Sequence, residues 1–227
     1  MSLWSKFTRF ASNDNKRKPV TIETPRLMLC EHKMSDIDTI HAITQKEGFS
    51  YSRFDDTREK VEDYIKFCIE AHEAVKDPKK QKAIYLAVIV KETGELIGHV
   101  NLRQEKHGDK TFDEINFFID PAHQNKGYGH EGIVNLMNYG FTVLGYDHFV
   151  STIHPKNAPS IRVAEKEGGQ IVGEVTLKTT KGEEPRVLLK TTFERFMNVR
   201  KNDKRPLLME KNTKGTAAYK KKFGFGK

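Results

Sequence analysis

The sequence predicts an α/β domain built on a mixed, mostly antiparallel sheet that is flanked by helices. Three strand-like segments separated by short polar stretches predict an antiparallel meander over residues 83–120. A glycine-containing loop, an amphipathic helix and a further strand, Phe149–Ile153, follow. A strand–helix–strand connection of this kind brings the later strand back in parallel. One crossover is therefore expected inside an otherwise antiparallel set.

The first elements are a broken strand and two helices. Val20–Cys30 alternates loosely, and Pro25 cannot donate a ladder hydrogen bond, which predicts an edge strand or a bulge. Ser35 is expected to cap a short helix, and Asp56, followed by Glu59, is expected to begin a longer one. The longer helix has an apolar stripe at helical spacing, formed by Val61, Tyr64, Ile65, Cys68 and Ile69.

The meander has one buried strand and two strands that return beside it. Ala83–Val90 is almost continuously apolar, as buried strands are. Leu96–Arg103 returns after a short turn and completes a hairpin. Glu105–Lys110 is expected to be a polar loop, and Phe112–Asp120 is the third strand, which Pro121 ends.

The C-terminal half adds two helices and a hairpin. The helix after the glycine loop has one apolar face, formed by Ile133, Leu136, Met137, Gly140, Phe141 and Leu144. Asn157 is expected to cap the next helix, which Gly168 ends. Ile171–Leu177 and Arg186–Phe193 are expected to pair as a terminal hairpin.

Composition excludes several classes of protein. The chain has 227 residues, of which 37% are hydrophobic, enough for one sizeable core with extensions. Cys30 and Cys68 cannot form a disulfide scaffold or a four-ligand zinc site by themselves. No stretch approaches the roughly 18 apolar residues of a membrane span, and residues 1–18 lack the apolar core of a signal peptide. We therefore expect a cytoplasmic protein.

The net charge of +8 is confined to one end of the chain. Residues 198–227 hold ten of the 39 Lys and Arg residues but only two of the 31 acidic residues, so the remainder is neutral. We expect an N-terminal appendage over residues 1–18 with the spacing of a short amphipathic helix, a domain over residues 19–197, and a basic tail over residues 198–227. Such a tail is either a solvated segment or an electrostatic handle for RNA or an acidic partner.

The loop DPAHQNKGYGHE, residues 120–131, has the features of an anion site. Gly127 and Gly129 allow unusual backbone conformations and the close approach of a ligand. Successive N–H groups and the dipole of the following helix favour negative charge, and Lys126 adds a positive charge. The loop therefore predicts pyrophosphate binding. It is not a Walker P-loop, and its match to G-x-G-x-x-G follows an antiparallel meander, unlike a dinucleotide-binding unit.

Three segments together resemble the GNAT N-acetyltransferase superfamily. Gln124–Gly129 is similar to the Q/R-x-x-G-x-G/A acetyl-CoA signature. Thr24–Leu29 and Asn157–Gly168 resemble the opening strand and the N-x-x-S-x-R-V-x-E-K-x-G helix of the ribosomal-protein N-terminal (alanine/serine) acetyltransferase branch. The resemblance covers about residues 19–195. It implies a GNAT fold, with a sheet of six to seven strands that splay apart at an acetyl-CoA slot.

The resemblance also implies where acetyl-CoA binds. The pyrophosphate would lie on the loop amides, and the pantetheine arm would add beside Phe118 and Ile119. Asn157 and Ser160 would contact the cofactor from the other side, near its thioester. The expected cofactor residues of the loop are Gln124, Asn125, Lys126, Gly127, Tyr128, Gly129 and His130. No metal is expected, because the nine histidines are scattered without H-x-x-x-H spacing near carboxylates.

Four residues are candidates for proton transfer, because an amine must be neutral to attack a thioester and the leaving thiolate needs a proton. Glu114 lies where the family often has a carboxylate that faces the acceptor; otherwise it is a solvated strand residue. His99, on the neighbouring strand, and His154, near the mouth of the slot, are each a base or relay, or else structural histidines. Ser160 either donates to the thiolate or is an ordinary first-turn serine.

The sequence thus predicts an acetyl-CoA-dependent N-acetyltransferase. The acceptor is a primary amine, either a protein N-terminus or a small amine, that attacks directly in a ternary complex. The alternative is a non-catalytic, GNAT-like CoA-binding module whose basic tail binds RNA or an acidic partner.

Overall fold

The computed structural model of the chain describes residues 17–49, 57–179 and 182–201. Most of the predicted N-terminal appendage and most of the predicted basic tail lie outside the described residues. Within the described ranges, no helix combines the length and the apolarity that crossing a lipid bilayer requires.

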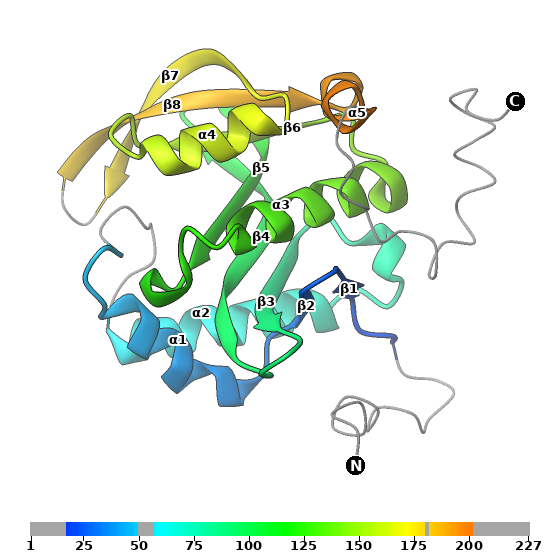
Figure 1. Cartoon of the computed structure of the whole chain (residues 1–227), viewed down its shortest axis with the longest axis vertical. Coiled ribbons are helices and arrows are strands. Elements are labelled where there is room, and N and C mark those ends of the chain that lie inside the picture. The colour runs from blue at the N-terminus through cyan, green and yellow to red at the C-terminus, as the bar shows by residue number, and fades with distance from the viewer. Residues whose placement is uncertain (1–16, 50–56, 180–181, 202–227) are drawn as a thin grey trace, which may run out of the picture.

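The described residues form an eight-stranded sheet in the order β1-β2-β3-β4-β5-β6-β8-β7 (Figure 1). The strands are β1 (Thr21–Glu23), β2 (Leu27–Glu31), β3 (Ile84–Val90), β4 (Leu96–His107), β5 (Lys110–Ile119), β6 (His148–Ile153), β7 (Gln170–Thr179) and β8 (Gly182–Thr192). Neighbouring strands are antiparallel except β5 and β6, which are parallel. The predicted mixed sheet with one crossover is confirmed, with eight strands instead of six to seven.

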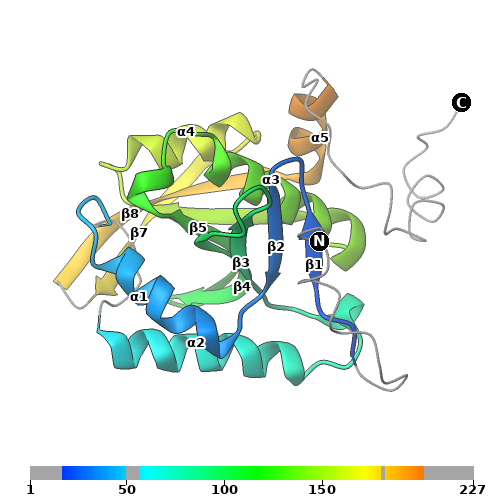
Figure 2. The same cartoon turned by 60° about the horizontal axis from the view of Figure 1, so that its bottom comes forward.

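Helices cover both faces of this sheet (Figure 2). α1 (Ile37–Thr44) and α2 (Arg58–Glu73) lie on one face, and α3 (Tyr128–Tyr139), α4 (Ala158–Lys166) and α5 (Phe193–Lys201) lie on the other. The core is divided in the same way. A cluster of Ile37, Ile40, Ile43, Val61 and Ile65 joins α1 to α2, and a larger cluster packs α3 and α5 against the strands.

The extra strand arises at Pro25, as the sequence indicated. β1 ends before Thr24, and β2 begins at Leu27. Pro25 has no N–H for the ladder, and the Leu27 N–H at the start of β2 donates to the Thr24 hydroxyl at 2.8 Å. β1 is the outermost strand of the sheet on this side, where an interrupted ladder is tolerated.

Both predicted helix caps on the α1–α2 side need revision. Ser35 lies inside a single 3₁₀ turn, Met34–Asp36, and α1 begins only at Ile37. The described part of α2 begins at Arg58, and its N-cap is Thr57, whose hydroxyl accepts from the Lys60 N–H. Asp56 lies outside the described residues.

The predicted polar loop over Glu105–Lys110 is wrong. β4 and β5 continue as a ladder to the His107–Lys110 pair, joined by Gly108 and Asp109. Gly108 has φ +61°, which a two-residue hairpin turn requires and glycine adopts without strain. These polar residues suggested a loop because most of them are exposed where the two strands end. His107, on β4, is buried there.

Helix α5 was not expected from the sequence, and it crosses the predicted domain boundary at residue 198. Phe196 is fully buried, with its ring 5.2 Å from that of Phe141 between centroids. Arg200, counted with the basic tail from sequence alone, forms an ion pair with the buried Glu167. The folded domain therefore includes residues up to Lys201.

Phe196→Ala tests whether α5 belongs to the core. We expect a loss of about 3–5 kcal/mol in the free energy of unfolding, because a fully buried aromatic side chain leaves a cavity. Phe67→Ala is the matched control, because Phe67 is 49% exposed on α2. Urea unfolding measures both variants. Equal losses would show that α5 does not pack as described.

Candidate active site

β5 and β6 share one register pair among the described residues. Glu114 and Val150 are register partners there, whereas β6 pairs with β8 along its whole length. Beyond Glu114, residues 115–119 of β5 have register partners only on β4. The Ile115 carbonyl accepts a hydrogen bond from the Ser151 hydroxyl of β6 at 3.4 Å, so the edge of β5 that faces β6 is open beyond Ile115. This is the predicted splay, and it places Phe118 and Ile119 on the open edge.

The loop after β5 has the backbone of an anion site. Asn125 has φ +60° and Gly127 has φ +79°, so two left-handed residues flank Lys126. Gly127 is the N-cap of α3, and a glycine has no side chain that could cap the first-turn N–H groups of this helix. Alternation of this kind points successive N–H groups toward a common point, where the helix dipole also favours an anion. Gln124 fastens the loop to the strand end by donating to the Ile119 carbonyl at 3.1 Å.

Gly129 is needed for packing as well as for access to the loop. A Cβ at this position would lie 2.6 Å from the Phe117 ring on β5. The first turn of α3 therefore lies directly on the strand that lines the slot. The two loop glycines have different roles, since a Cβ on Gly127 would meet only the Arg26 guanidinium, at 3.4 Å.

Arg26 holds the loop in place, a role that the sequence reasoning missed. Its Nε donates to Glu131 Oε2 at 2.7 Å, and its Nη1 donates to the Lys126 carbonyl at 2.9 Å. Its guanidinium lies 4.6 Å from the centre of the Tyr128 ring. Thr24 donates to the other oxygen of Glu131 at 2.6 Å. From sequence, Thr24 and Arg26 stood out only as part of the segment that resembles the family. Their contacts join residues 100 to 107 positions apart.

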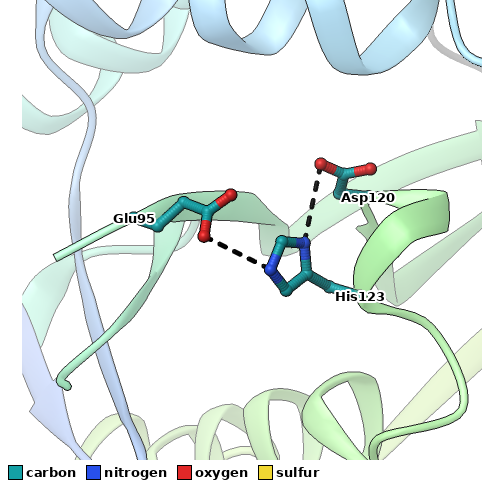
Figure 3. A group of neighbouring side chains, drawn as sticks. All are labelled: Glu95, Asp120 and His123. Carbon is teal, nitrogen blue, oxygen red and sulfur yellow. Dashed lines mark ion pairs between the residues drawn. The ribbon is translucent and has the colours of Figure 1, made fainter. Parts of the chain in front are cut away.

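A second polar cluster fixes the start of the loop (Figure 3). Lys46 donates to both oxygens of Asp120, at 3.0 and 2.7 Å. His123 lies between Asp120, at 3.6 Å, and Glu95, at 3.3 Å. Glu95, Asp120 and His123 are close enough to share a metal ion. The Lys46 ammonium already neutralises the buried carboxylate of this group, so the residues fit a structural ion-pair cluster better than a metal site.

His130 contacts α4 and α5 through a buried carboxylate. It forms an ion pair with Glu167, and the other oxygen of Glu167 pairs with Arg200. Glu167 is 1% exposed. The structure thus joins the first turn of α3 to the end of α4 and to α5. A contact of His130 with the cofactor stays a prediction.

We expect the start of α4 to form the far side of the slot, and this placement stays a prediction. Asn157 is its N-cap, as expected, and its side-chain oxygen accepts from the Ser160 N–H at 3.2 Å. Ser160 is half-buried in the first turn. His154 follows β6 and is half-buried, and its Nδ1 accepts from the Lys156 N–H at 3.1 Å.

Glu114 is not a solvated strand carboxylate. It is fully buried at the last β5 position with a partner on β6. His107 Nε2 lies 3.0 Å from one of its oxygens, and the Thr152 hydroxyl donates to the other. Glu114 is therefore placed beside the slot, with both oxygens bound by strands on either side of it.

His99 is the buried candidate base. It lies opposite Phe118 on the neighbouring strand, and the two rings stack with centroids 5.6 Å apart. Burial lowers the pKa of His99 well below 6.5, and the nearby His32 and Arg103 lower it further. His99 is thus a neutral ring that faces α1 and α2.

The described residues thus form an open, mostly antiparallel sheet, with a glycine loop that follows the open edge of β5. Residues 26–170 match the acetyltransferase (GNAT) domain family, and the chain belongs to this family. It is an N-acetyltransferase, a class that uses acetyl-CoA.

Three known proteins illustrate the similarity. The N-acetyltransferase YnaD of Bacillus subtilis (strain 168) is 28% identical over 151 residues, which cover 65% of this chain and 81% of YnaD. The ribosomal-protein-S5-alanine acetyltransferase of Vibrio fischeri superposes with a TM-score of 0.61 at 18% identity, over 76% of this chain and 96% of that one. RimJ of Mycobacterium smegmatis, in complex with CoA-disulfide, has a TM-score of 0.60 at 16% identity, and the match covers 78% of this chain and 87% of RimJ. The fold is therefore shared with the branch that the sequence resembles.

Glu131→Gln tests how the loop is anchored. Burial opposes ionisation of Glu131, but hydrogen bonds from Thr24 and Arg26 hold its pKa below the usual value. A lowered folded-state pKa stabilises the protein above the unfolded pKa of about 4.3, and this contribution is lost as pH falls. We expect Glu131→Gln to lose about 1–2 kcal/mol at pH 7 and much less near pH 3.5.

Urea unfolding at the two pH values measures the difference. Glu165→Gln, a change on the exposed face of α4, is the control. A loss for Glu131→Gln that does not change with pH would show that the charge of Glu131 contributes nothing.

Proposed function

We propose that this protein transfers the acetyl group of acetyl-CoA to the α-amine of a protein or peptide, by direct attack in a ternary complex. The observation that carries the proposal is the single register pair between β5 and β6, with the glycine-capped N-terminus of α3 after the open strand edge. The loop accommodates a pyrophosphate and the edge accommodates an extended arm. A non-catalytic CoA-binding module needs the same loop, but family membership favours the enzyme.

The residues present fit acetyl-CoA. The amides of the loop from Gln124 to Gly129 would hold its pyrophosphate, with the exposed Lys126 nearby. The open edge of β5 at Phe118 and Ile119 would pair with the pantetheine arm. Asn157 and Ser160 would meet it from α4. When bound, acetyl-CoA supplies an activated thioester carbonyl; the protein supplies position and proton transfer.

An α-amine is the acceptor that demands least of this site. Its reference pKa of about 8 leaves a usable neutral fraction at pH 7, whereas a lysine amine, near 10.4, is almost fully charged. Glu114 is a poor direct base, because it is fully buried with both oxygens occupied. We assign to Glu114 the role of joining β5 to β6 at the point where the slot begins. We assign to Ser160 the role of donating a hydrogen bond to the leaving thiolate. His154 lies at the mouth of the slot as a secondary candidate.

The solved neighbours support a protein acceptor over a small amine. One of them is a ribosomal-protein-S5-alanine acetyltransferase by name. We assign the acceptor face to α1 and α2; residues 50–56, between these helices, lie outside the described residues.

Gly127→Asp tests the cofactor loop. The substitution places a negative charge where the pyrophosphate would lie, so we expect acetyl-CoA binding to fall below detection in calorimetric titration. Gly145→Asp is the matched control, because Gly145 has the same φ of +79° and a Cβ there meets nothing within 4 Å. Unchanged affinity in a folded Gly127→Asp protein would contradict the assignment.

The acceptor class is tested by turnover of acetyl-CoA on three sets of amines. We expect acetylation of peptides with a free N-terminus. Matched peptides with a blocked N-terminus and an internal lysine, and small polyamines, should react at least about 10-fold more slowly, because their amines are more fully charged at pH 7. Faster turnover of the small amines would overturn the proposed acceptor.

A further inference from the structure

A continuous chain of hydrogen bonds crosses the interior between the acceptor face and the surface. Asp36 Oδ2 lies 3.1 Å from His32 Nδ1, and His32 Nε2 lies 2.8 Å from His99 Nδ1. At the other end, His99 Nε2 lies 3.1 Å from the Tyr64 hydroxyl and 3.0 Å from Asn101 Nδ2. The two imidazole rings are nearly parallel, with 25° between their planes and centroids 5.0 Å apart, as the edge-to-edge hydrogen bond requires.

The partners fix which nitrogen of each ring carries the proton. Asp36 can only accept, so His32 Nδ1 is the donor and His32 Nε2 is left as an acceptor. His99 Nδ1 must then donate to His32. His99 Nε2 is consequently bare, and it accepts from the amide of Asn101 and the hydroxyl of Tyr64. Every bond of the chain has one donor and one acceptor, and the depressed pKa of His99 agrees with a neutral ring.

The inner end of this chain lies beside the splay. Asn101 is opposite Asn116, and Asn116 is two residues beyond Glu114, the last β5 residue paired with β6. Asn101 Oδ1 and Asn116 Nδ2 are buried and have no hydrogen-bond partner among the described residues. A carbonyl acceptor and an amide donor side by side match the N–H groups and the carbonyl next to a peptide α-amine.

The outer end reaches solvent. The side chain of Asp36 is 16% exposed at the turn before α1, whereas that of His32 is inaccessible. Asp36 also accepts from the Lys33 N–H at 3.0 Å, which orients the carboxylate. A proton that arrives at Asp36 can therefore leave for bulk water without returning through the slot.

We propose that Asp36, His32, His99 and Tyr64 form a proton relay that removes the proton of the acceptor ammonium. This inference rests on the proposed function. The ammonium gives its proton to the Tyr64 oxygen as the Tyr64 proton passes to His99 Nε2. The Nδ1 proton of His99 passes to His32 Nε2, and the Nδ1 proton of His32 passes to Asp36. Each relay group gains one proton and loses one, and Asp36 releases the last to water.

The chemistry of the acceptor then balances. The neutral amine forms the new C–N bond as the thioester C–S bond breaks, and its second proton leaves with the thiol. Asp36 is a positioning residue and a proton outlet. The titratable and charged groups packed around the relay are Arg103 on β4, Tyr85 on β3, His72 and Cys68 on α2, and Cys30 near Asp36. No proton transfer is assigned to any of them.

Asp36→Asn tests the relay in the full chain with an N-terminal peptide as acceptor. The variant keeps an oxygen for the Lys33 N–H but cannot take up a proton. We expect kcat/KM to fall about 10-fold at pH 6, and to match the wild type at pH 9, where an amine of pKa about 8 is already neutral. The Kd for acetyl-CoA should not change. Tyr64→Phe, which keeps the ring, should show the same pH-dependent loss.

Asp38→Asn is the matched control, because Asp38 lies in the first turn of the same helix, with its side chain 80% exposed and paired to Arg58. It should behave as the wild type at both pH values. An Asp36→Asn loss that is equal at pH 6 and pH 9, or an equal loss in Asp38→Asn, would overturn the relay.

A second measurement separates the relay from the proposed function. ¹⁵N NMR of the histidine rings should find His32 and His99 protonated at Nδ1 and bare at Nε2. The opposite tautomers would reject the relay even if the enzyme acetylates peptides. If the wild type turns over no amine, the proposed function fails. The chain of hydrogen bonds then has no role in removing a proton during acetyl transfer.

Discussion

The contact between Glu114 and Val150 is the constraint on which the site depends. Two parallel strands must be joined firmly at one point and open directly beyond it. An isolated buried carboxylate would be costly, but His107 from the β4–β5 hairpin and Thr152 from β6 each bind one oxygen of Glu114. The bonds that satisfy these two oxygens also fasten the hairpin to β6. These polar contacts of Glu114 thus keep β5 and β6 together at the point where their ladder ends.

The alternation of β5 separates the two halves of the reaction. Ile115, Phe117 and Ile119 belong to the side that packs with α3, where Gly129 lets the helix rest on the Phe117 ring. Glu114, Asn116 and Phe118 face the other side, toward α1 and α2. One strand therefore presents its open backbone edge to the cofactor, its apolar face to the loop helix, and its polar face to the acceptor. The period of two makes this division unavoidable.

The sequence could predict the features that are local. The apolar run of β3, the break at Pro25, the loop glycines and the Asn157 cap each follow from a few adjacent residues, and all appear where expected. Contacts between distant residues could not be predicted. Arg26 holds a loop that lies 100 residues away, and Glu167 joins His130 to Arg200. α5 was missed because its apolar residues, Phe193, Phe196 and Met197, are few and lie beside a basic segment that suggested a solvated tail.

The buried histidines show why composition alone understates the chemistry of this face. His32, on the segment after β2, and His99, on β4, are 67 residues apart, and neither has a motif around it. A pair of histidines in the core would lower the stability of the fold unless every ring nitrogen had a hydrogen-bond partner. Here Asp36, Tyr64 and Asn101 provide those partners. In this order, each group between Tyr64 and Asp36 donates its proton to the next group toward Asp36. All the donors therefore point the same way, from the acceptor face to Asp36. A purely structural pair requires only that the nitrogens be satisfied. This chain also ends at solvent on one side and, on the other, beside two amide atoms that have no partner among the described residues, Asn101 Oδ1 and Asn116 Nδ2.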